Sequence, residues 1–147
     1  MPAKPPENMP RIVPNVFYDD PAAALEWLSK SFGFETRSSI PSPDGGVMHA
    51  EMQVADSAFM MSPTAAGDEW SSPTSLGGKV TQTLYIYVDG VDEHCARARS
   101  AGATIVSEPE TMFWGDRTYV ALDLEGHRWT FAEHVKDVAP EDMKPPA

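Results

Sequence analysis

The 147-residue chain is poor in cysteine, in basic side chains and in long apolar runs. Its one cysteine, Cys95, has no second thiol in the chain with which to form a disulfide, which fits a reducing compartment. No apolar run approaches the length of a membrane-spanning helix, and the proline-rich start lacks the apolar core of a signal peptide. These absences predict a cytoplasmic protein in which Cys95 is a buried structural thiol.

Basic residues are outnumbered two to one, with 11 Lys and Arg against 22 Asp and Glu and a formal net charge of −11. A surface this negative repels phosphate backbones and anionic lipids, so neither nucleic acid nor a membrane is expected as a partner. The charge favours a cationic ligand, although acidity is also a common means of keeping a protein soluble. Hydrophobic residues make up 41% of the chain, which is enough for one folded core.

The most informative pattern in the sequence is an internal repeat of one strand, one helix and three strands. Asp20 with Pro21 opens the first helix and Gly33 ends it, while Asp89 opens the second helix and Gly102 ends it. Both intervals are thirteen residues long. Two stretches of the chain therefore predict two βαβββ modules of the α+β class.

Alternating and apolar runs give the expected strands of each module. In the first module they cover residues 11–18, 34–40, 47–54 and 58–62, and in the second residues 80–88, 103–106, 117–122 and 128–134, with 107–112 expected as a loop. The domain then spans residues 10–134, as modules 10–62 and 80–134 joined by the linker 63–79. Residues 1–9 and 135–147 are expected as tails.

Several local sequences carry a resemblance to a known family. They are residues 48–52 (Met-His-Ala-Glu-Met), 114–117 (Trp-Gly-Asp-Arg) and the hairpin 123–131 (Asp-Leu-Glu-Gly-His-Arg-Trp-Thr-Phe). With the duplicated module, they resemble the vicinal-oxygen-chelate superfamily of glyoxalases, bleomycin-resistance proteins and extradiol dioxygenases, and within it the glyoxalase-like subgroup associated with phosphonate-utilisation operons. The resemblance implies that the two modules form an open, curved, barrel-like sheet whose trough holds the ligand. It also implies a homodimer, and the linker 63–79 is long enough to exchange modules between subunits.

Metal-using members of this superfamily hold one divalent ion at four strand positions, which the resemblance carries onto Val13, Met60, Thr83 and Thr130. These side chains offer no carboxylate and no imidazole, so neither the metal site nor any cofactor is expected. Two pairs leave open a relocated metal site or an acid/base pair: His49 and Glu51, two residues apart on one strand, and Glu133 and His134 at the end of the last strand. The simpler interpretation of His49 and Glu51 is a polar strand that faces solvent. For Glu133 and His134 the simpler interpretation is a fraying strand end.

Aromatic side chains dominate the predicted trough. Strand alternation turns Phe17, Tyr85 and Tyr87 inward, and Trp114 and Arg117 flank the loop that leads to the next-to-last strand. These five residues are the expected ligand-binding set. A competing interpretation is that Tyr85 and Tyr87 only fill the barrel interior. For Arg117, the competing interpretation is an ion pair with Asp116 or Asp123. His94 is expected to be exposed, and His127 to have a turn or packing role.

Three functions are compatible with these observations. The first is a metal-free protein that binds a small aromatic or cationic organic molecule, which the resemblance to bleomycin-resistance proteins and the net charge favour. The alternative is a metal-dependent lyase, isomerase or dioxygenase with relocated ligands. A regulatory or structural protein without a small ligand is the third. No catalytic residue is identified, because the chain has no nucleophile elbow and no glycine-rich phosphate loop.

Overall fold

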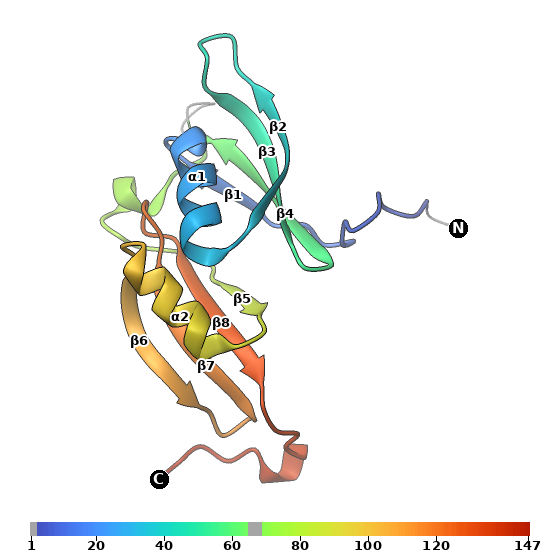
Figure 1. Cartoon of the computed structure of the whole chain (residues 1–147), viewed down its shortest axis with the longest axis vertical. Helices are drawn as coiled ribbons and strands as arrows, with labels where there is room; N and C mark the ends of the chain where they lie inside the picture. The colour runs from blue at the N-terminus through green and yellow to red at the C-terminus, as the bar shows by residue number, and fades with distance from the viewer. Residues whose placement is uncertain (1–2, 65–68) are drawn as a thin grey trace. The chain divides into compact units, whose positions relative to one another are not determined.

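The structure, a computed structural model, describes residues 3–64 and 69–147. The chain divides into two compact units, Met1–Gly77 and Gly78–Ala147. Each unit is one βαβββ module in which a helix lies across one face of an open four-stranded sheet (Figure 1). The predicted α+β class and the duplicated module are thereby confirmed. Within the described ranges, no helix combines the length and the apolar character needed to cross a membrane.

The first unit contains β1 (Asn15–Tyr18), α1 (Pro21–Phe32), β2 (Glu35–Pro41), β3 (Val47–Val54) and β4 (Ser57–Pro63), followed by the short 3-10 helix η2 (Pro73–Leu76). The sheet order is β1-β4-β3-β2, with β1 parallel to β4 and the other pairs antiparallel. The first strand begins at Asn15, which is paired with Met60 of β4, and not at residue 11.

Helix α1 begins and ends as its sequence predicts. The Asp20 side chain accepts a hydrogen bond from the Ala23 amide at 3.1 Å, and Pro21 occupies the first turn, where its missing N–H costs nothing. Gly33 ends the helix at φ 76°, a left-handed conformation that glycine adopts without strain. The apolar side of the helix, with Ala24 and Leu28 fully buried, forms the core of this unit together with buried residues of β3 and β4.

The second unit contains β5 (Leu84–Tyr87), α2 (Val91–Ser100), β6 (Thr104–Thr111), β7 (Asp116–Leu122), β8 (Arg128–His134) and the short 3-10 helix η3 (Pro140–Asp142). Its sheet order, β5-β8-β7-β6, repeats that of the first unit. The start of α2 differs from expectation, because Gly90 at φ 65° is the N-cap in place of Asp89. Strand β5 is also shorter than the predicted 80–88.

The prediction of a loop over residues 107–112 is wrong, because β6 continues as a strand to Thr111. Its run Ser-Glu-Pro-Glu-Thr is polar and contains a proline, which ordinarily argues against a strand. Strand β6 lies at the edge of the sheet, however, and its pairing with β7 shifts register between Ile105 and Ser107 and again between Ser107 and Glu110. Bulges at an edge accommodate a residue that has no N–H to donate.

The two faces of the second sheet differ in character. One face packs on α2, where Tyr119, Trp129 and Phe131 are buried with Cys95, which confirms the predicted burial of the thiol. Strand pairing places a second set on the opposite face: Tyr85 beside Thr130, Thr130 beside Val120, Tyr87 beside Ala132, Ala132 beside Thr118, and His134 beside Asp116. We call this the open face, because it is turned away from α2.

Candidate ligand-binding site

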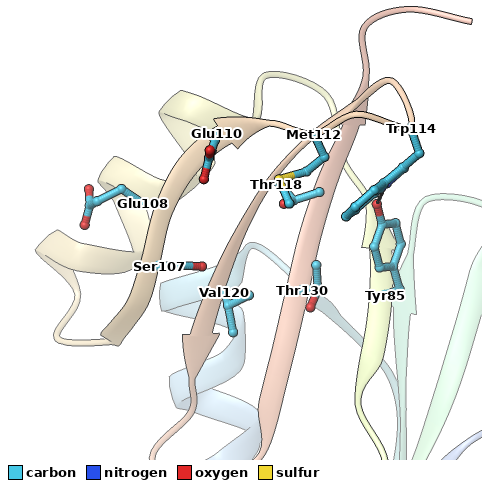
Figure 2. A pocket seen from close by; sticks show the side chains of 9 residues that line it. All are labelled: Tyr85, Ser107, Glu108, Glu110, Met112, Trp114, Thr118, Val120 and Thr130. Atoms are coloured by element: carbon cyan, nitrogen blue, oxygen red, sulfur yellow. Dashed lines mark hydrogen bonds between the residues drawn. The ribbon is translucent and has the colours of Figure 1, made fainter. Parts of the chain in front are cut away.

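A cavity of about 360 Å³ lies on the open face of the second sheet (Figure 2). It combines two aromatic rings at one end, hydroxyls and apolar groups along its floor and carboxylates along β6. The lining residues are Tyr85, Ser107, Glu108, Glu110, Met112, Trp114, Thr118, Val120 and Thr130. A cavity of this size, mostly apolar with a few polar groups, suits a small organic molecule.

The two carboxylates of the cavity are in different situations. Glu108 forms an ion pair with Arg99 of α2 and is therefore already neutralised. Glu110 is exposed, and no ion pair or side-chain hydrogen bond joins it to another residue of the described chain. Glu110 is thus the carboxylate that a bound cation could contact.

A buried carboxylate, that of Asp116, organises the aromatic end of the cavity. The Asp116 side chain is only 4% exposed, and its Oδ2 accepts hydrogen bonds from the hydroxyls of Tyr85 at 2.6 Å and Tyr87 at 2.9 Å. Trp114 in turn donates its indole N–H to the Tyr85 oxygen at 3.2 Å. Between Asp116 on β7 and the tyrosines on β5 lies β8, where the small side chain of Ala132 leaves room for these contacts.

The protonation states of this cluster follow from its hydrogen bonds. Burial alone would raise the pKa of Asp116, but the hydrogen bonds from Tyr85, His134 and Tyr87 outweigh it and hold the pKa of the carboxyl below its usual value. Burial and then the bond to Asp116 raise the pKa of Tyr85 to about 12, and the bond to Asp116 also raises the pKa of Tyr87. At neutral pH the carboxylate is therefore ionised and both phenols are protonated.

His134 closes the cluster on its other side. Its Nδ1 lies 2.7 Å from Asp116 Oδ1, and its Nε2 lies 2.6 Å from Asp137 Oδ1. Because both carboxylates accept, both ring nitrogens must carry a proton, as they do only in the imidazolium form. The bonds to Asp137 and Asp116 accordingly raise the pKa of His134. His134 is thus anchored within β8, and the interpretation of residues 133–134 as a fraying strand end is wrong.

We expect the folding stability to fall as the pH rises through the pKa of His134. A folded-state pKa above the ordinary 6.5 means that protonation stabilises the fold below that pH, and that this contribution is lost as the pH passes the raised value. The variant His134→Asn keeps a donor for Asp116 but does not titrate. The measurement is urea unfolding across neutral pH, with the variant's free energy subtracted from that of the natural chain. A difference that stays constant with pH would contradict the assignment.

The structure brings three of the five predicted ligand-binding residues together: Tyr85, Tyr87 and Trp114 meet around Asp116. Phe17 belongs to the first unit, where its ring stacks on Trp70 with centroids 4.7 Å apart. Arg117 lies on the opposite face of the second sheet and pairs with Asp92 of α2 at 3.0 Å, not with Asp116 or Asp123.

The remaining predicted side chains have mostly structural contacts. Glu51 lies 3.7 Å from His49 and 3.4 Å from Arg37, so a guanidinium already shares its charge. Glu133 accepts the Val91 amide at the start of α2. The expectation that His94 is exposed is wrong, because it is half-buried, 2.6 Å from the Tyr119 hydroxyl and packed on Phe131. The backbone N–H of His127 bonds to Asp123 in the hairpin turn.

The residues at the four positions inferred for the superfamily's metal do not fit a divalent ion. Pairing of Asn15 with Met60 and of Tyr85 with Thr130 puts Met60 and Thr130 at equivalent places in the two units. A thioether and a hydroxyl, with Val13 and Thr83 as the other two, supply no charged oxygen and no imidazole. Over residues 3–64 and 69–147, no three His, Cys, Asp or Glu side chains gather closely enough to hold a metal ion.

Comparison with known proteins identifies the family. The profile of the Glyoxalase/Bleomycin resistance protein/Dioxygenase superfamily matches residues 9–131. The chain belongs to this superfamily. An uncharacterized protein of Mycobacterium bovis is 33% identical over 138 residues, covering 92% of this chain and 90% of its own length.

Solved structures share this fold. The crystal structure of TioX from Micromonospora sp. ML1 is 34% identical in sequence, with a TM-score of 0.69 over 84% of this chain and 98% of that chain. A family enzyme from Burkholderia phytofirmans PsJN has a TM-score of 0.65 at 23% identity, over 82% of this chain and 95% of its own, and supports the fold alone. A superfamily that contains both resistance proteins and enzymes does not fix a reaction, so function has to be argued from the site.

Proposed function

We propose that this member of the glyoxalase/bleomycin resistance superfamily binds a small, planar, positively charged aromatic molecule, without a metal ion. The observation that carries the proposal is the cavity of about 360 Å³ with Trp114 and Tyr85 at one end and the unpaired carboxylate of Glu110 on its β6 side. The faces of indole and phenol rings attract cations, and they provide flat apolar area for stacking.

The charges of the chain support a cationic ligand in two ways. The net charge of −11 draws cations toward the protein over long range, an effect that salt weakens. At short range, Glu110 is available because Arg99 is committed to Glu108. An anionic aromatic molecule would meet this carboxylate and the overall charge unfavourably. The preference for cations is therefore a direct test of the proposal.

Isothermal titration with the planar aromatic cation proflavine tests the proposed function. We expect saturable binding, with 1-naphthalenesulfonate, a flat aromatic anion, binding at least about tenfold more weakly. Trp114→Ala should weaken proflavine binding by about tenfold, the loss expected for one stacked aromatic contact. Glu110→Gln should weaken it less and reduce its dependence on salt. Glu26→Gln, an exposed change on α1, is the matched control and should alter neither.

Equal binding of the cation and the anion would contradict the proposal, as would proflavine binding that survives both Trp114→Ala and Glu110→Gln unchanged. Either result would place the ligand elsewhere or remove charge as the basis of recognition.

A metal-dependent lyase, isomerase or dioxygenase with relocated ligands is the second candidate. It is favoured by His49 and Glu51, whose side chains share one face of β3 with 3.7 Å between Nε2 and Oε2. Against it, Glu51 is bound by Arg37, and two donors leave a divalent cation far short of the ligands it needs. Titration with Mn²⁺ or Ni²⁺ separates the candidates, because ion binding that disappears in His49→Ala would favour the enzyme.

A further inference from the structure

At the aromatic end of the cavity, the side-chain donors of Tyr85 and Trp114 form hydrogen bonds within the protein, and so does the hydroxyl of Tyr87, which neighbours the lining residue Tyr85 but does not line the cavity itself. Tyr85 and Tyr87 have one hydroxyl proton each, and both hydroxyls lie within hydrogen-bond distance of the same Asp116 oxygen, at 2.6 and 2.9 Å. An ionised carboxylate only accepts, so each phenol must point its proton at Asp116. The indole N–H of Trp114, its one donor, is directed at the Tyr85 oxygen.

What these groups present to a ligand is therefore a set of lone pairs. The Tyr85 hydroxyl donates one hydrogen bond, to Asp116, and its oxygen accepts one, from Trp114. One lone pair of that oxygen therefore remains. The Tyr87 hydroxyl donates to Asp116, and the residue, which lies beside the cavity, is 58% exposed, so a ligand that extends past Tyr85 would meet an oxygen that can only accept. Glu110, on β6, is likewise an acceptor when ionised.

We propose that the aromatic end of the cavity accepts hydrogen bonds from its ligand and donates none, so that the ligand carries N–H donors, as an arylamine does. This inference rests on the proposed function and narrows its ligand class. Asp116 is then a positioning residue that acts through the two tyrosines. A ligand carbonyl or carboxylate at this end would meet only other acceptors and could form no hydrogen bond with them. It would lose its hydrogen bonds to water without replacement.

His134 helps to keep the aromatic end of the cavity an acceptor of hydrogen bonds. As an imidazolium it donates to Asp116 Oδ1, so the carboxylate receives three donors and keeps its charge. The other charged group facing His134 is Asp137, while its neighbours Arg117 and Glu133 lie on the α2 side, paired with Asp92 and the Val91 amide. Elsewhere in the cavity, Ser107, Thr118 and Thr130 have hydroxyls that either donate or accept, so the discrimination is confined to the aromatic end.

Two dyes provide a matched pair of probes. Proflavine and acridine orange are the same flat tricyclic cation, but methyl groups replace the four amino hydrogens of proflavine in acridine orange. Burial of apolar surface by itself favours the methylated dye. We expect the reverse order, with proflavine binding about tenfold more tightly, as one or two hydrogen bonds to the tyrosine oxygens allow.

The variants Tyr85→Phe and Tyr87→Phe keep the rings and remove the acceptors. Each should weaken proflavine by a few-fold while leaving acridine orange nearly unchanged, and Glu26→Gln should preserve the full preference. Because Tyr87 is largely exposed, we expect Tyr87→Phe to fold even if Tyr85→Phe does not.

The outcomes separate this inference from the proposed function. Equal affinities, a preference for acridine orange, or a proflavine preference that survives in Tyr85→Phe and Tyr87→Phe would overturn the inference while leaving aromatic cation binding in place. If neither dye binds at any concentration tested, the proposed function fails and the inference fails with it.

Discussion

Replacing Gly115 by alanine is expected to lower the free energy of unfolding by about 3 kcal/mol, at the upper end of the range for overpacked sites. A Cβ at this position would lie 1.9 Å from the carbonyl oxygen of Lys136, and Gly115 has φ +100°. The close approach is built in, because the amides of Val135 and Lys136 both donate to the Gly115 carbonyl at 3.0 and 3.1 Å. The obstacle is backbone and cannot swing aside.

Gly102→Ala is the matched control for this prediction. Gly102 has φ +102°, but nothing lies within 4 Å of the Cβ that alanine would add. In Gly102→Ala the free energy of unfolding should fall only by the cost of placing alanine in the left-handed conformation, about 1 kcal/mol. Urea unfolding of both variants then isolates the clash. Since Gly115 follows Trp114 in the turn, Gly115→Ala should also weaken proflavine binding. Equal losses of stability in the two variants would contradict the close packing of this turn against residues 135–136.

Asp123→Ala should also cost about 3 kcal/mol, because it removes several hydrogen bonds and leaves a buried donor without a partner. Asp123 is 7% exposed, and its carboxylate accepts hydrogen bonds from the amides of Glu125 and His127, each at 3.0 Å, and from the indole N–H of Trp129, also at 3.0 Å. Trp129 is fully buried against α2, so water cannot replace the lost acceptor.

Asp44 offers a comparison within the same chain. It also sits in a turn and accepts from the Gly46 amide at 3.0 Å, but it is exposed and no buried donor depends on it. Asp44→Ala should therefore have a much smaller effect than Asp123→Ala in the same urea titration. If Asp123→Ala lowers the free energy of unfolding no more than Asp44→Ala does, the Trp129 N–H has found another partner.

The parts of the fold that depend on local chemistry were predictable from the sequence. The cap of α1 by Asp20 and its end at Gly33 follow from residues adjacent in the chain, and strands 47–54 and 128–134 have the predicted bounds. Strand β6 was not predictable in its second half. Its polar, proline-containing sequence becomes a strand only because β7 pairs with it at a bulged edge, which is a tertiary effect.

The same division applies to the site. Alternation along β5 was enough to place Tyr85 and Tyr87 on one face, and both lie there with Trp114. Alternation along β7 carried a further signal: Arg117 shares its face with the buried Tyr119, while Asp116 shares the other with Thr118. The role of Asp116 was not visible in the sequence, because its partners lie about 30 residues before it and 18 residues after it and meet only across three paired strands.

Binding at the open face of the second sheet can be tested directly with the tryptophan indole signals of ¹⁵N-labelled protein. The chain has four tryptophans, of which Trp27 and Trp70 are in the first unit and Trp129 is buried against α2. On titration with proflavine, the Trp114 indole signal should shift most, together with the backbone amide of Glu110. If the largest shift occurs at Trp70 while Trp114 does not move, or if binding saturates without any change at Trp114, the ligand does not bind at the open face.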